Sequence, residues 1–153
     1  MAKFIKKKDD DASKINTASL PDIVFMILMF FMVSVSMRKM DRMVMVTMPQ
    51  ATEIAKLERK DLSSYIYIGT PVLQYQGLHG TDSRIQLNDS FKSVDDIRDF
   101  VAAARESLSE QDRPFMTVSI KADENTRMGI ITDVKQELRR CSALKIMYGA
   151  RKK

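Results

Sequence analysis

The strongest constraint on this chain is an apolar stretch near its N-terminus. Residues 18–37 read ASLPDIVFMILMFFMVSVSM and contain one ionisable side chain, Asp22. About 20 residues of α-helix span roughly 30 Å, the thickness of a hydrocarbon core. From Ile23 to Val33 every helical face would be apolar, whereas a helix in a soluble core has one apolar stripe. A cleaved signal peptide would need a small-x-small site, but this stretch ends in Ser-Met-Arg-Lys. The pattern predicts a retained single-pass transmembrane helix over residues 18–37.

The charge distribution around this stretch predicts its orientation. The flanking basic residues are Lys3, Lys6, Lys7, Lys8, Lys14, Arg38, Lys39 and Arg42. The excess before the helix favours a cytoplasmic tail, residues 1–17, and places the rest of the chain outside the cytoplasm. The formal net charge of +5 then reflects topology and anionic lipid, which argues against nucleic-acid binding. A single cysteine excludes an intrachain disulfide framework.

Asp22 allows two interpretations. A carboxylate in hydrocarbon costs about 2.5–3.5 kcal/mol on the insertion scale, so such residues usually mark proton or ion pathways. The structural alternative is a helix start, because Ser19-x-x-Asp22 has the spacing of a capping box and Pro21 suits a first turn. Asp22 would then complement the positive end of the helix dipole. The spacing leaves both interpretations open.

The stretch Leu20–Val33 resembles the transmembrane signature of the ExbD/TolR family of biopolymer transport proteins. That signature is a basic tail, a proline close before a single aspartate, and an aliphatic and aromatic run. Here Pro21 directly precedes Asp22, whereas many members place the proline three residues earlier. Two later segments are also similar to the family: Val44-x-Val46-x-Met48-Pro49-Gln50-Ala51 to its extended Leu-Pro-x-Ala segment, and residues 118–123 to its strand ending in Ala-Asp. Residues 52–91 are the least family-like.

The resemblance implies a proton-driven motor subunit of the bacterial inner membrane, with its C-terminal domain in the periplasm. It would form a homodimer inside a ring of an ExbB- or TolQ-like membrane protein and act on a TonB- or TolA-like protein. Asp22 would carry protons, and Ser19 and Pro21 would set the helix start and pack near it. Val46, Met48 and Pro49 would form a partner-binding or regulatory segment. Peptidoglycan is a further candidate partner, and no enzyme activity, cofactor or metal is implied.

Two other functions remain open at this point. A TolR-like chain would serve envelope integrity rather than outer-membrane uptake. A membrane-tethered periplasmic binding module would use Asp22 only as a helix cap. A flagellar-type stator resembles the anchor, but about 115 residues after it leave no room for an additional peptidoglycan-binding domain.

The remainder of the chain predicts a linker over residues 38–62, with a short extended segment, and a small α+β domain over residues 63–153. Strands are expected at 64–68, 72–75, 85–87, 115–123 and 144–148. Helices are expected after Ser93, along the stripe Val94, Ile97, Val101, Ala104 and Leu108, and at 128–141, where Ile131, Val134, Leu138 and Cys141 are buried. Residues 51–62 are also helix-compatible. The expected fold is a mixed sheet with two helices on one face.

Few other residues indicate chemistry. His79 lies between glycines in an expected loop and is interpreted as a surface residue, and Cys141 as a buried thiol. Five of the twelve methionines follow the anchor: Met37, Met40, Met43, Met45 and Met48. Thioethers bind Cu(I), but no cysteine or histidine accompanies this cluster, so flexible packing is favoured.

Overall fold

The computed structural model describes residues 19–36 and 40–153. The chain divides into two compact units, Met1–Lys39 and Met40–Lys153. The expected cytoplasmic tail, residues 1–17, lies outside the described residues, as do positions 18 and 37, where the apolar stretch begins and ends. We call residues 40–153 the C-terminal domain.

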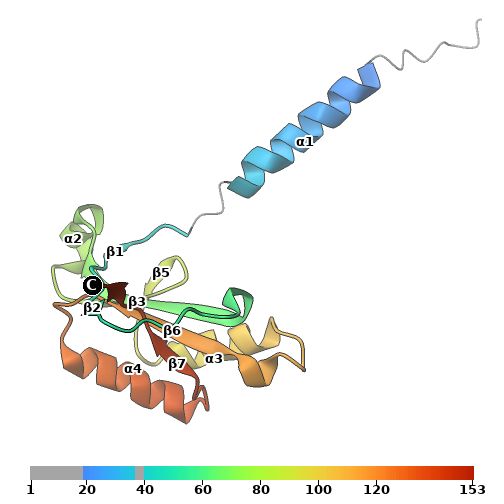
Figure 1. The fold of residues 1–153 in the computed structure, drawn as a ribbon. Coiled ribbons are helices and arrows are strands. Elements are labelled where there is room, and N and C mark those ends of the chain that lie inside the picture. Colours follow the sequence, from blue (N-terminus) through green and yellow to red (C-terminus); the bar gives the residue numbers. More distant parts are fainter. Residues whose placement is uncertain (1–18, 37–39) are drawn as a thin grey trace, which may run out of the picture. The chain divides into compact units, whose positions relative to one another are not determined.

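Within the first unit, helix α1 (Leu20–Ser36) comprises 17 residues of the apolar stretch (Figure 1). Its large apolar side chains are at least half exposed on every face, from 50% for Val24 to 77% for Met32. No helix among residues 19–36 and 40–153 is both long and apolar enough to cross a membrane. The structure therefore shows the predicted helix but not the predicted span.

The C-terminal domain contains a six-stranded mixed sheet with β3 near its middle (Figure 1). Strand β3 pairs in antiparallel fashion with β4 and in parallel with β6. The order is β5-β4-β3-β6-β7, and β1 adds an antiparallel pair at the end of β3. A separate parallel pair joins β2 to β8. The strands are β1 (Val44–Met45), β2 (Gln50–Ala51), β3 (Ser63–Pro71), β4 (Arg84–Leu87), β5 (Ser90–Lys92), β6 (Thr117–Ala122), β7 (Ile146–Tyr148) and β8 (Arg151–Lys152).

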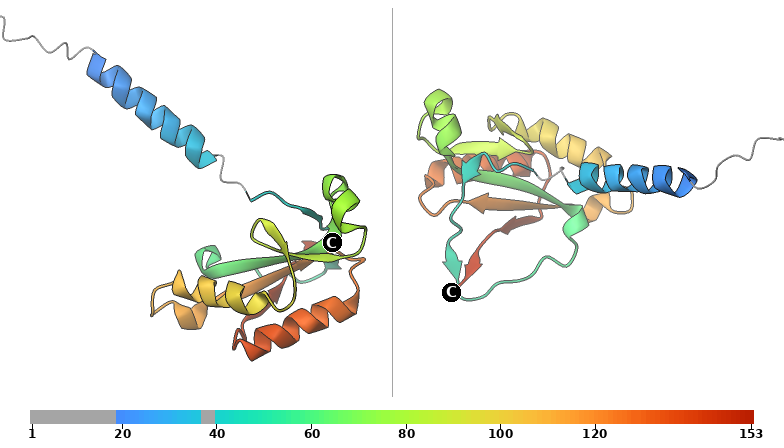
Figure 2. Two further views of the ribbon diagram at one scale, coloured as in Figure 1. Left: turned by 180° about the vertical axis from the view of Figure 1, so that it is seen from behind. Right: turned by 90° about the horizontal axis from the view of Figure 1, so that it is seen from above.

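Helices α3 (Ile97–Glu106) and α4 (Met128–Arg140) lie on the same side of the sheet (Figures 1 and 2). Helix α3 connects β5 to β6 and α4 connects β6 to β7, and the two strands joined by each helix run in the same direction, as in βαβ units. The core between helices and sheet includes the fully buried residues Ile66, Ile68, Ile97, Val118, Ile120, Val134 and Leu138. The predicted α+β fold with two helices on one face of a mixed sheet is confirmed for this domain. The helix expected after Ser93 begins at Ile97 and ends at Glu106, so Val94 and Leu108 pack against the core from outside the helix. In α4, Val134 and Leu138 are buried as predicted, whereas Ile131 and Cys141 are half-buried.

The expected strand at residues 72–75 is wrong. Strand β3 continues to Pro71, and a seven-residue helix, α2 (Leu73–His79), follows. The Gln76 side-chain Nε2 donates to the Pro71 carbonyl at 2.8 Å, and Gly80 closes the helix at a φ of 73°, which glycine adopts readily. This local bonding outweighs the β propensity of the short Val-Leu-Gln-Tyr run.

Two other segments also differ from expectation. Residues 51–62 form no α-helix; they contain the end of β2 and a single 3₁₀ turn, Lys60–Leu62. Leu144 precedes β7 instead of facing the core from it, and is 74% exposed. The C-terminal unit starts at Met40, so the segment expected as a linker contributes β1 and β2 to it.

Candidate functional site

Asp22 lies in the first turn of α1 and is exposed. Residues three, four and seven positions later share its helical face, which makes Phe25, Met26 and Met29 its neighbours along the surface. These three side chains are 65%, 65% and 58% exposed. The described part of α1 therefore presents one carboxyl group at the end of an otherwise apolar surface.

Ser19 and Pro21 lie at the start of the same helix. Ser19 directly precedes α1, and Pro21 is its second residue. Proline is tolerated at this place because the first N–H groups of a helix have no intrahelical partner. Both residues therefore lie at the start of the helix, and Asp22 follows within the first turn.

The second candidate region is residues 41–51 of the C-terminal domain, which we call the docked segment because the rest of the domain contacts it along its length. The buried Gln86 side chain of β4 holds its start. Its Oε1 accepts from the Met43 N–H at 2.9 Å, and its Nε2 donates to the Asp41 carbonyl at 2.8 Å. The same Nε2 donates to the Asn88 carbonyl at 2.8 Å. The amide group is fully used, and Gln86 is only 1% exposed.

The middle of the docked segment pairs with β3. Val44 lies opposite Pro71 and Met45 opposite Thr70, and the Val44 side chain is only 2% exposed. Gly69 permits this approach, because a Cβ at that position would collide with the Met45 carbonyl oxygen. A glycine is therefore required where the segment crosses β3.

The structure brings together the two family-like segments of the C-terminal domain, which are far apart in the sequence. The Asp123 carboxylate accepts a hydrogen bond from the Thr47 N–H at 2.7 Å, and the Glu124 N–H donates to the Thr47 carbonyl at 3.0 Å. The Ala-Asp end of β6 is thus the partner of the Val-x-Met-Pro segment.

The predicted partner-binding residues lie within the docked segment. Val46 and Met48 are half-buried and Pro49 is exposed. Met48 lies close to Gly149, and the Pro49 carbonyl accepts from the Arg151 N–H at 2.8 Å. Met48 and Pro49 therefore contact the chain's own C-terminal strand region, whereas Val46 lies close to Gly69 of β3.

Two buried polar residues, Gln86 and Glu137, have no distinguishing pattern in the sequence. Gln86 lies between Ile85 and Leu87, an alternation that predicts a solvent-facing side chain. Glu137 of α4 is 5% exposed; its carboxylate pairs with Arg98 of α3 at 3.3 Å and with Arg140 at 3.1 Å. No sequence signal identifies either residue, because Asp41, Met43 and Arg98, with which they bond, lie more than 35 positions away.

His79 and Cys141, the two residues considered for other chemistry, both pack against apolar or aromatic side chains. His79 is the last residue of α2 and packs against the Phe91 ring, with 4.6 Å between ring centroids, so it is half-buried rather than on a solvated loop. Cys141 is half-buried against the core. Within residues 19–36 and 40–153, no group of three or more His, Cys, Asp or Glu residues could hold a metal ion.

Comparison with known proteins identifies the family of this chain. The sequence profile described as biopolymer transport protein ExbD/TolR matches residues 8–151, nearly the whole chain. No individual curated protein matches the chain. The family is a non-enzymatic one with an energy-transducing role in biopolymer transport, and its members generally work with ExbB/TolQ-type and TonB/TolA-type partners. This chain belongs to the ExbD/TolR family of biopolymer transport proteins.

Proposed function

We propose that this chain is an ExbD-like motor subunit that converts proton flow into mechanical work on a TonB-like protein for uptake across an outer membrane. Residues 18–37 would cross the inner membrane with the N-terminus in the cytoplasm. The observation that supports this proposal best is α1 itself. Its apolar side chains are exposed on every face, and it contains one carboxyl group, Asp22.

The exposed surface of α1 requires a covering that the described residues do not provide. Burying a leucine, isoleucine or phenylalanine side chain contributes about 1.5–3 kcal/mol of favourable free energy. Large apolar side chains are exposed in every turn of α1. Lipid and the helices of a ring-forming membrane partner would supply that covering. The carboxyl group of Asp22 would then lie against partner helices rather than water.

Asp22 would act by changing its charge. Burial away from water disfavours the charged form of a carboxyl group, so protonation and release shift the preferred position of the helix within the ring. Each state stabilises a different arrangement, because a carboxylate seeks a polar partner and a neutral carboxyl tolerates apolar walls. The membrane potential contributes about 2.3 kcal/mol per charge per 100 mV, which is enough to bias such steps.

The docked segment would transmit this motion to the C-terminal domain. It follows α1 in the sequence, and its Asp41, Met43 and Thr47 backbones are bonded to β4 and to the end of β6. A displacement of α1 would therefore reach residues 41–51 before the rest of the domain. The expected assembly is a homodimer within an ExbB-like ring, which co-purification from membranes tests.

The substitution Asp22→Asn tests the proton step. It keeps the size and hydrogen-bonding capacity of the side chain but removes its titration, so we expect normal membrane insertion and partner co-purification with complete loss of proton-driven uptake. Asp133→Asn, on the exposed surface of α4, makes the same change outside the apolar helix and should retain full uptake. Full uptake by Asp22→Asn would refute the mechanism and favour a tethered binding module.

The role within the family is tested separately. An ExbD-like chain acts on a TonB-like partner. Deleting the gene for this chain should therefore abolish energy-dependent outer-membrane uptake while the envelope stays intact. A TolR-like chain would show the reverse, with envelope leakage and normal uptake. The gene neighbourhood provides a second readout, since a TonB-like gene beside this one favours the ExbD-like role.

A further inference from the structure

A cavity of about 550 Å³ lies at the end of the C-terminal domain where α3 and α4 finish. We call it the basic cavity. Its lining contains three basic residues and no acidic one: Arg105, Arg113, Pro114, Met116, Ser142, Ala143, Leu144 and Lys145. Within the described residues, none of Arg105, Arg113 and Lys145 takes part in an ion pair. Three cations converge on one space without a counter-charge in its wall.

The basic side chains are held in place by backbone groups. Arg105 Nη2 donates to the Cys141 carbonyl at 2.8 Å, and Arg113 Nε donates to the Arg105 carbonyl at 3.2 Å. A guanidinium has five N–H donors, so each arginine retains donors for a further partner. Lys145 is fixed through its backbone, because its carbonyl accepts from the Val118 N–H at 2.8 Å.

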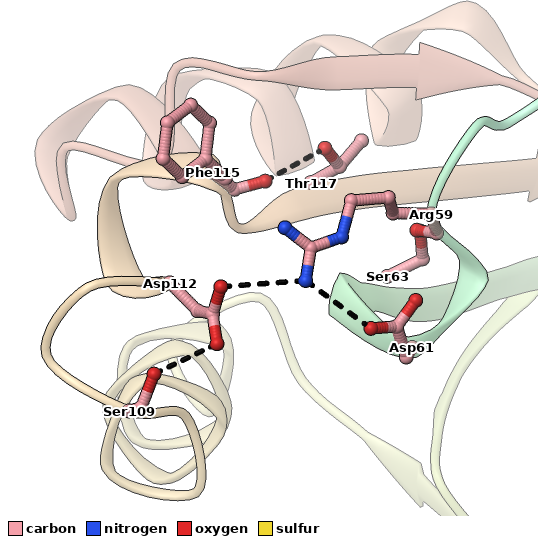
Figure 3. A network of polar contacts seen from close by, with 7 residues as sticks. All are labelled: Arg59, Asp61, Ser63, Ser109, Asp112, Phe115 and Thr117. Carbon is pink, nitrogen blue, oxygen red and sulfur yellow. Dashed lines mark hydrogen bonds and ion pairs between the residues drawn. The ribbon is translucent and has the colours of Figure 1, made fainter.

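The acid beside Arg113 in the sequence does not neutralise it. Figure 3 shows the Asp112 carboxylate turned towards Arg59 and Ser109, with Arg59 Nη2 at 3.4 Å and Ser109 Oγ at 2.7 Å. The C-terminal ends of α3 and α4 each contribute about half a negative charge near the cavity. The three basic side chains of the wall therefore have no acidic side chain in the same lining to pair with.

Apolar surface adjoins these cations. Leu144 is 74% exposed and lines the basic cavity, and Phe115 is 54% exposed just beyond it. The Lys145 Nζ lies 4.7 Å from the centroid of the Phe115 ring. A second cavity of about 320 Å³ shares Lys145 with the first and is lined by Lys56, Glu58, Arg59 and Phe115 among others. Lys145 thus joins two adjoining hollows.

We propose that the basic cavity binds an acidic peptide segment of a partner protein, with a carboxylate on Arg113 and Lys145 and an aliphatic side chain against Leu144. Charge complementarity selects the carboxylate, since guanidinium groups bind carboxylates through paired hydrogen bonds. The apolar wall and the adjoining hollow favour a peptide over a small inorganic anion, which would leave both unused. This interaction is independent of proton transfer at Asp22.

The test measures binding of a fluorescein-labelled hexapeptide, Leu-Glu-Leu-Glu-Leu-Glu, to the purified full chain in a non-ionic detergent by fluorescence anisotropy. Loss of one charge-assisted contact should weaken binding about tenfold in Arg113→Gln and likewise in Lys145→Gln. Arg127→Gln is the matched control. Its side chain is 82% exposed, it directly precedes α4, and it lies about 20 Å from the far end of that helix. It should bind like the wild type.

The peptide is varied in the same experiment. Replacing glutamate by glutamine should weaken binding to the wild type about tenfold, and raising the salt concentration should weaken binding of the acidic peptide. Any of four results would overturn the proposal: no binding by the wild type, unchanged affinity in both cavity variants, an equal loss in Arg127→Gln, or equal binding of the glutamine peptide. Equal binding of a peptide with serine in place of leucine, together with full displacement by inorganic phosphate, would show a bare anion site instead.

Discussion

Helix α1 and the C-terminal domain differ in the solvent exposure of their isoleucine side chains. In the domain, Ile66, Ile68 and Ile120 have no exposed surface, because helices and sheet cover one another. In α1, Ile23 and Ile27 are 54% and 50% exposed, although they are the same type of residue. The domain buries these isoleucines in its own core, whereas no described residue covers those of α1.

The two regions also differ in how they treat charge. Glu137 of the domain is buried against Arg98 and Arg140, so its carboxylate has fixed partners. The apolar stretch that contains Asp22 has no basic residue to serve as such a partner. This contrast supports our proposal that Asp22, rather than Glu137, takes part in the proton step.

The largest expected effect on stability comes from truncating an isoleucine to alanine, which we compare in the two regions. Ile120→Ala should destabilise the C-terminal domain by about 2–5 kcal/mol because it leaves a cavity in a packed core. Ile27→Ala should change the domain's free energy of unfolding by less than about 0.5 kcal/mol. Urea unfolding of the full chain in detergent, followed by tyrosine fluorescence, measures this directly. The chain has no tryptophan and all four tyrosines lie in the domain. Equal destabilisation by both changes would break the distinction between the two regions.

An intermediate effect is expected at the boundary, where the docked segment joins the domain. Gln86→Leu removes the amide that bonds Asp41 and Met43, and loss of these buried hydrogen bonds should cost about 1–3 kcal/mol. Hydrogen exchange followed by mass spectrometry should show that, relative to the wild type, exchange in the variant becomes faster in residues 41–51 but not in β6. Gln136→Leu, on the exposed face of α4, is the matched control. Unchanged exchange in Gln86→Leu would mean that pairing of β1 with β3 is sufficient to hold the segment.

The smallest effect concerns a carboxyl with fixed partners on the domain surface. The Ser93 N–H and Oγ–H both donate to Asp96 Oδ2 at 2.8 Å, and these bonds, the backbone one first, hold the pKa of Asp96 below its ordinary value of 3.8. A lowered folded-state pKa stabilises the domain above the ordinary pKa, and this contribution disappears as the pH falls through the lowered value.

Ser93→Ala keeps the backbone bond and removes the hydroxyl bond. We expect the pKa of Asp96 to rise towards 3.8 in an NMR titration, and the stability difference from wild type to shrink as the solution is acidified below that pH. Ser107→Ala, whose hydroxyl donates only to the Ala104 carbonyl, should leave the pKa of Asp96 unchanged. An unchanged pKa in Ser93→Ala would assign the shift to the backbone bond alone.

Much of the domain could be predicted from local patterns. The stripes of α3 and α4 and the alternation along β6 follow from helical and strand periodicity, since Ile97, Val101, Val118 and Ile120 all face the core. Helix α2 could not be predicted in this way, because seven residues are too few to show a period. Its helix depends instead on the Gln76 bond to Pro71 and on Gly80.

The candidate sites divide in the same manner. Asp22 stands out in the sequence because a single charge within an apolar stretch needs no tertiary information to be noticed. Gln86 and the basic cavity do not stand out. The Gln86 amide finds its partners in residues 41–43, more than 40 positions away. Arg105, Arg113 and Lys145 line one cavity because α3, the turn after it and the loop before β7 meet there.

The amino-acid sequence by itself therefore determined the apolar helix, its single carboxyl group, the periodic core of the domain and the membership of the family. These properties depend on neighbours within a few positions of one another along the chain. Only the tertiary structure decided that the segment after the helix is docked on β4, β3 and the end of β6. The physical reason is that a buried hydrogen bond needs a partner, and here the partners lie about 25 to 80 positions away, beyond the reach of any local pattern.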